Sequence, residues 1–164
     1  MADSKRESDA ADTPRVQVAW LAQRGQEALL DGQLAEMMSL VEQGFALAEA
    51  NDLQEDVCFV SLLLVYGDGA LAAEEAESAA SMYKSAEGVL LELAGPDGAD
   101  HTESTLALLG RVRIGLARAD VERGLLERAQ ERYRSGLKIL ERLGDAVPAR
   151  ALTEVRRELE ALTG

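Results

Sequence analysis

Cysteine, histidine, proline and aromatic residues are all scarce in this 164-residue chain. The single cysteine, Cys58, cannot form a disulfide within the chain. The single histidine, His101, cannot complete a typical zinc site with a cysteine so distant in the sequence, so we expect it to be a surface turn residue. Aromatic residues make up only 4% of a chain that is rich in Leu, Ala and Glu, which favours helices over sheets. The composition therefore predicts an all-α protein, and it suggests neither a metal nor a cofactor.

Sequence signatures of catalysis and of membrane insertion are also missing. We find no Ser-His-Asp set in a family-like context, no phosphate-binding glycine loop and no Glu-x-x-His pair, so we do not expect an enzyme. No apolar run is long enough to span a bilayer, and the first residues have no apolar stretch of the kind found in a secretory signal. We therefore expect a cytoplasmic protein, with a disordered tail over residues 1–14 and one helical domain over residues 15–164.

The formal net charge of −13 is unevenly distributed along the chain. Between Glu27 and Glu103 there are 17 acidic residues and one base, Lys84, whereas 12 Lys/Arg and 9 acidic residues follow from Thr105 onward. Such an acidic middle repels phosphate backbones and anionic lipids, so neither nucleic acid nor a membrane is an expected partner. The asymmetry is typical of a solvated surface, or it orients a partner of matching charge.

One helical pattern is present twice in the sequence. A small residue, a tyrosine four residues later and a second small residue three further on lie along one stripe of a helix. The two occurrences are Ala79, Tyr83 and Ala86, and then Ala129, Tyr133 and Gly136. Repetition of this kind indicates that the chain builds one packing unit more than once.

Apolar periodicity and turn residues predict seven helices. We expect them over residues 15–30, 34–50, 53–66, 75–93, 102–121, 125–143 and 148–162. The apolar run from Val57 to Tyr66 has the composition of a buried strand, but a lone strand has nothing to pair with. We interpret it as a helix buried on most sides, followed by Gly67 and Gly69.

The spacing of these residues resembles the tetratricopeptide repeat (TPR), whose second helix carries Ala-x3-Tyr/Phe-x2-Ala. Leu116-Ala117 and Gly124 precede the second copy of the pattern, as they do in that family. Steps of 42 residues from Met37 to Ala79 and of 50 to Ala129 are similar to the long repeats of kinesin light chains and many bacterial proteins. The resemblance covers residues 18–162. It implies a right-handed α-solenoid of about three hairpins with a C-terminal capping helix.

The resemblance also implies a concave groove lined by the first helix of each hairpin. The positions that map to this groove are Gln26, Ser61, Leu64, Asp68, Arg111, Ile114 and Arg118. Arg111 and Arg118 are seven residues apart and lie on one helix face. Either they bind a carboxylate of a partner, or they neutralise Asp68 and neighbouring acidic residues.

The function expected from these features is that of an adaptor or scaffold. Its partner would be a peptide or protein segment, with acidic groups or a C-terminal carboxylate as the recognised chemistry. The alternative is a structural helical bundle that self-associates as a homo-oligomer, through the last helix or the exposed edge of the first hairpin. Trp20 covers the edge of the core in one interpretation and is a binding hot spot in the other.

Overall fold

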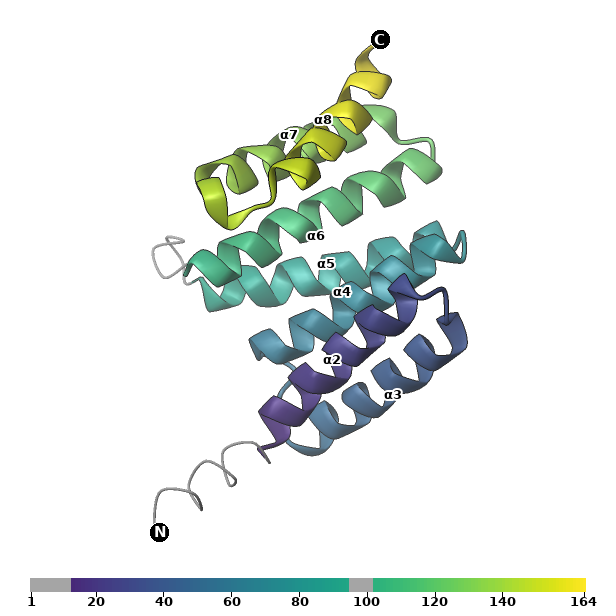
Figure 1. The fold of residues 1–164 in the computed structure, drawn as a ribbon, viewed down its shortest axis with the longest axis vertical. Helices are drawn as coiled ribbons and strands as arrows, with labels where there is room; N and C mark the ends of the chain where they lie inside the picture. Colours follow the sequence, from purple (N-terminus) through teal and green to yellow (C-terminus); the bar gives the residue numbers. More distant parts are fainter. Residues whose placement is uncertain (1–12, 95–101) are drawn as a thin grey trace.

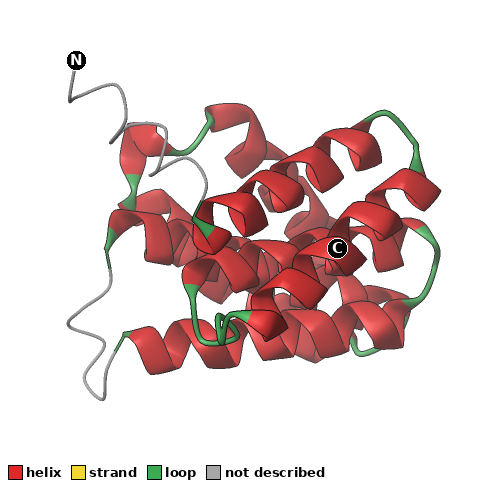
Figure 2. Ribbon diagram, turned by 90° about the horizontal axis from the view of Figure 1, so that it is seen from below, coloured by secondary structure: helices red, strands yellow, loops and turns green. Residues whose placement is uncertain are grey.

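The computed structural model describes residues 13–94 and 102–164, and these residues form seven α-helices and one 3₁₀ turn. The elements are α2 (Pro14–Leu30), α3 (Leu34–Ala50), α4 (Val57–Ala72), α5 (Ala76–Leu93), α6 (Glu103–Glu122), α7 (Leu126–Arg142), η1 (Gly144–Ala146) and α8 (Ala149–Thr163). No strand occurs in the described residues (Figure 2), so the prediction of an all-α protein is confirmed. Residues 1–12 of the tail expected over residues 1–14 lie outside the described residues. The turn that contains His101 also lies outside them.

Six of the helices form three consecutive hairpins. Helix α2 packs against α3, α4 against α5, and α6 against α7, and each hairpin then contacts the next one. Figure 1 shows α2 and α3 at one end of the long axis and α7 with α8 at the other. Helix α8 packs against α7 and ends the series of described helices. The core therefore extends along the molecule as a chain of adjoining hydrophobic clusters.

The hairpin turns have one shared geometry. The backbone adopts a positive φ at Gly32, Glu74 and Gly124, with values of 74°, 60° and 74°. In each turn the next residue donates its amide hydrogen to a carbonyl five residues earlier, at 2.8 Å. This is the Schellman ending of a helix, in which glycine is the residue that adopts the left-handed conformation without steric cost. The second turn places a glutamate in that conformation.

The prediction that the Val57–Tyr66 run is a buried helix is confirmed, although both of its expected limits are wrong. Asp56 caps the helix by accepting a hydrogen bond from the Cys58 amide at 2.9 Å, so α4 begins at Val57 rather than near Leu53. The helix continues through Gly67 and Gly69 to Ala72. Its two glycines do not end the helix. They leave room for side chains that pack against it from neighbouring helices.

The ring of Tyr83 lies fully buried between α4 and α6. A Cβ atom at Gly67 would lie 2.7 Å from Cε1 of this ring, and one at Gly115 would lie 2.5 Å from Cζ. Non-bonded carbon atoms do not approach one another this closely, so the ring needs glycine on both sides. Tyr133 is 2% exposed and shares a hydrophobic cluster with Ala117, 50 residues after Gly67. The predicted packing among small residues is confirmed for Tyr83, and Tyr133 is buried as predicted, in a cluster made mostly of larger aliphatic residues.

Trp20 does not belong to the core. Its side chain is 56% exposed on α2, whereas Val18 and Leu21 beside it are buried. The interpretation that this tryptophan covers the core is therefore wrong for the described residues.

We predict that Glu74→Gly raises the free energy of unfolding by about 0.5–1 kcal/mol. A side chain in the left-handed region costs about 1–2 kcal/mol, and glycine removes this cost. Part of the gain is lost because glycine makes the unfolded chain more flexible. Urea unfolding measures this difference. Glu75→Gly is the matched control, since it removes the same charge at a residue with φ −98°. Equal stability of the two variants would contradict the strain at Glu74.

Candidate functional site

The expected groove residues occupy equivalent positions in successive hairpins. A shift of 42 residues relates Gln26 to Asp68, and a further shift of 50 relates Asp68 to Arg118. The shift of 50 also relates Ser61 to Arg111 and Leu64 to Ile114. The first helix of each hairpin thus presents the same positions with different chemistry.

Five of the seven expected residues line one hollow. This hollow has a volume of about 260 Å³ and lies between α4, α6, the last turn of α7 and the first turns of α8. We call it the α4–α6 groove, and its lining consists of Leu64, Asp68, Arg111, Ile114, Gly115, Arg118, Leu140, Ala151, Glu154 and Val155. An apolar floor and a charged rim are the usual features of a site that accepts one side chain of a partner.

The other two expected residues lie away from this hollow. The Ser61 hydroxyl donates to the Val57 carbonyl of its own helix at 3.5 Å. The Gln26 Oε1 atom is buried and has no hydrogen-bond partner in the described part of the chain. Neither residue lines the groove.

A second, more open hollow of about 480 Å³ adjoins the groove and shares Asp68 and Arg118 with it. Its other lining residues are Leu71, Ala72, Val121, Glu122, Tyr133 and Glu158. Asp68 and Arg118 therefore stand at the junction of the two hollows.

Asp68 is the acceptor at the centre of the groove. The Tyr83 hydroxyl donates to its Oδ1 at 2.6 Å, and Arg111 Nη2 donates to its Oδ2 at 3.5 Å. Burial raises the pKa of Asp68, and the hydrogen bond from Tyr83 and the charges of Arg111 and Arg118 offset that rise only in part. The ring that separates α4 from α6 thus also places its hydroxyl on the groove carboxylate.

Arg118 is already bound to a carboxylate of the same chain. Its Nε and Nη2 atoms donate to the two oxygens of Glu158 on α8 at 2.9 and 2.7 Å, and the Tyr133 hydroxyl donates to Glu158 Oε2 at 2.6 Å. Burial would raise the pKa of Glu158, but these hydrogen bonds and the charge of Arg118 outweigh it and hold the pKa below its ordinary value. This forked pair ties α8 to the third hairpin.

The two arginines of the groove therefore differ in availability. Arg118 makes both contacts of a bidentate pair, whereas the Arg111 side chain is 51% exposed and has one long contact with Asp68. The contact between Arg111 and Asp68 is the one expected if Arg111 neutralises acidic residues of its own chain. Half of the Arg111 side chain still faces solvent at the groove rim.

A second charged cluster lies outside the groove, around Asp120. This carboxylate is fully buried and accepts hydrogen bonds from Arg123 at 3.1 Å, from Arg128 at 3.0 and 2.8 Å, and from Arg132. Burial would raise the pKa of Asp120, but the arginines outweigh that effect and lower it. Arg123 also bonds Glu77 at 2.7 Å, so the cluster joins the second hairpin to the third.

Sequence reasoning missed both Glu158 and Asp120. Asp120 carries a visible signal, since it is equivalent to the buried Ala28 and Ala70 of the other hairpins. A carboxylate at a small apolar position requires charged partners, and Arg128 and Arg132 follow at helical spacing. Glu158 carries no comparable signal, because its partner is set by how α8 docks.

Residues 13–94 and 102–164 contain no group of three or more Asp, Glu, His or Cys side chains arranged to hold a metal ion. None of the described helices combines the length and apolarity needed to cross a bilayer. Comparison with protein-family models, with curated proteins and with solved structures gave no match. The α4–α6 groove is therefore the feature of the molecule that bears most directly on function.

We predict that the protein loses stability in acid. A carboxyl with a lowered pKa in the folded state stabilises the fold above its unfolded pKa of about 4, and this contribution is lost as the pH falls through the folded pKa. Asp120 and Glu158 act in this sense. Asp68 has a raised pKa and acts in the opposite sense, losing its contribution as the pH rises. Urea unfolding between pH 7 and pH 3 measures the net slope.

The Asp120→Asn variant isolates the part of this effect that comes from the buried cluster. It should be about 2 kcal/mol less stable at pH 7, which is below the full cost of breaking a buried pair because the arginines can reach water. Its stability should also fall less steeply toward pH 3. Asp145→Asn, at an exposed carboxyl, is the control. A slope in Asp120→Asn equal to that of the unmodified protein would contradict the assignment.

Proposed function

We propose that this protein is a cytoplasmic, non-catalytic adaptor whose three hairpins form a right-handed TPR-type solenoid with α8 as its capping helix. The support for the repeat is the shared turn geometry at Gly32, Glu74 and Gly124, together with the shifts of 42 and 50 residues that align the hairpins. The α4–α6 groove is the site that receives a segment of the partner.

The half-exposed Arg111 at the rim of an apolar hollow is the observation that carries this proposal. An arginine with one long contact keeps donors available for a carboxylate of the partner, and a guanidinium binds a carboxylate in paired, planar geometry. The floor beside it, formed by Leu64, Ile114 and Val155, is suited to an aliphatic side chain.

The charges around the groove restrict the partner further. Asp68 and Glu154 also line the hollow, and Glu158 already satisfies Arg118. A run of several acidic residues would be repelled by these carboxylates. The partner that fits is a segment with one carboxylate next to an aliphatic residue.

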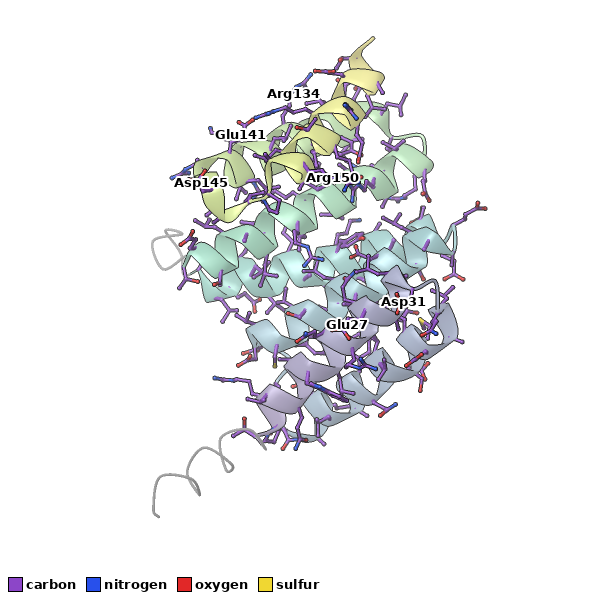
Figure 3. All side chains as sticks on the ribbon, viewed as in Figure 1. Glu27, Asp31, Arg134, Glu141, Asp145 and Arg150 are labelled. Atoms are coloured by element: carbon purple, nitrogen blue, oxygen red, sulfur yellow. The ribbon has the colours of Figure 1, made fainter. Side chains whose placement is uncertain are left out.

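We predict that Arg111→Gln weakens binding of such segments about tenfold or more, because a hydrogen bond to a charged group contributes about 1.5–3 kcal/mol. A peptide array with varied acidic and aliphatic positions, read by fluorescence anisotropy for the selected peptides, measures this loss. Arg134→Gln is the matched control, since it removes the same charge at an exposed position of α7 that does not line the groove (Figure 3).

The outcome that contradicts the proposal is selection of the same peptides, at the same affinities, by the unmodified protein and by Arg111→Gln. Enrichment of polyacidic peptides would contradict the charge argument. Arg118 is unsuitable for this test, because its replacement breaks the bond with Glu158 that helps to hold α8 in place.

A further inference from the structure

The outer face of α2 carries exposed apolar side chains. Val16 is 44% and Trp20 is 56% exposed, and these residues lie one helical turn apart. Arg24 follows one turn later on the same face and bonds Glu27 at 2.9 Å. Helix α2 packs against α3 and α4 through its opposite side.

The equivalent face is buried in the other two hairpins. The shifts of 42 and 50 residues relate Trp20 to Leu62 and then to Val112, and both of these are fully buried. Leu62 contacts the preceding hairpin at Gly44, where a Cβ atom would lie 2.5 Å from Leu62 Cδ2. Val112 shares a cluster with Leu90 of the preceding hairpin. The face that exposes Trp20 is thus the face with which each later hairpin receives its neighbour.

At the other end of the stack, the described residues form no matching apolar surface. Helix α8 turns its buried Val155 toward the cluster of α6 and α7. Its outward positions are the exposed polar residues Arg150, Thr153 and Arg157 (Arg150 is labelled in Figure 3). Head-to-tail stacking of copies would therefore set a polar helix against Trp20.

We propose that the outer face of α2 binds the same face of a second copy and forms a two-fold symmetric dimer. The face offers both halves of a symmetric contact, because the exposed Trp20 side chain lies one helical turn from the half-exposed Arg24. In an antiparallel pair, Arg24 of each copy lies over Trp20 of the other, which is a favourable cation–π arrangement. This surface is separate from the α4–α6 groove and does not depend on the proposed function.

The contact is small, and its strength depends on salt in a characteristic way. One pair of helices buries less surface than the roughly 1,200 Å² of the smaller specific interfaces, so we expect dissociation in the micromolar range or weaker. Each copy carries a net charge of −13, and salt screens the repulsion between copies. Added salt should therefore strengthen the dimer, whereas it should weaken binding of a carboxylate at Arg111.

Sedimentation of the full chain across about 1–500 μM tests this proposal, combined with tryptophan fluorescence. Trp20 is the single tryptophan of the chain, so its emission reports on this face alone. We expect a monomer–dimer equilibrium, accompanied by an emission shift to shorter wavelength as the dimer forms. Trp20→Glu should remain monomeric with an unchanged melting temperature, because the side chain is mostly exposed. Leu126→Glu, at another exposed leucine, should dimerise as the unmodified protein does.

Three results would overturn the proposal. The first is a monomer at every concentration, whatever the emission wavelength of Trp20. The second is a dimer that forms without any change in that emission, or that Trp20→Glu forms equally well. The third is growth into larger species, which is the mark of head-to-tail stacking.

Discussion

The structure depends on one aromatic ring held between two glycines. Tyr83 projects from α5 into the space between α4 and α6, where Gly67 and Gly115 leave room for its two sides. This contact fixes the distance between the second and third hairpins. It also explains why the ring can be fully buried while its hydroxyl still reaches a polar partner at Asp68.

The same ring links the core to the groove. Because the Tyr83 hydroxyl binds Asp68, the packing between hairpins sets the position of the carboxylate that holds Arg111. In the third hairpin, Tyr133 plays the corresponding part with Glu158, but that carboxylate comes from α8. The hollow that adjoins the groove is therefore lined by the carboxylates of both tyrosine–carboxylate pairs, Asp68 and Glu158, and α8 supplies the second of them.

The helices could be predicted because they depend on local sequence features. Helix limits and ion pairs that depend on tertiary contacts could not. Apart from the limits of α4, the expected helices match those of the structure within one or two residues, because caps and turn residues such as Gly124 act within a few positions. The sequence wrongly predicts a helix end at Gly67, because a single sequence does not distinguish a glycine that serves packing from one that ends a helix. Five of the seven expected groove positions line one hollow, whereas Gln26 and Ser61 lie away from it although they are equivalent to Asp68 and Arg111. The pairing of Arg118 with Glu158 could not be predicted, since it depends on the docking angle of α8.

Urea unfolding of Gly115→Ala beside Gly88→Ala tests the central claim most directly. A Cβ atom at Gly115 meets the buried ring at 2.5 Å, whereas nothing lies within 4 Å of one at Gly88 on α5. The ring cannot retreat, because Gly67 confines its other side. Gly115→Ala should therefore lower the free energy of unfolding by about 1–3 kcal/mol, and Gly88→Ala should raise it by about 0.5–1 kcal/mol through helix propensity. Equal shifts in both variants, or a stabilised Gly115→Ala, would contradict the claim that the Tyr83 ring is held between Gly67 and Gly115.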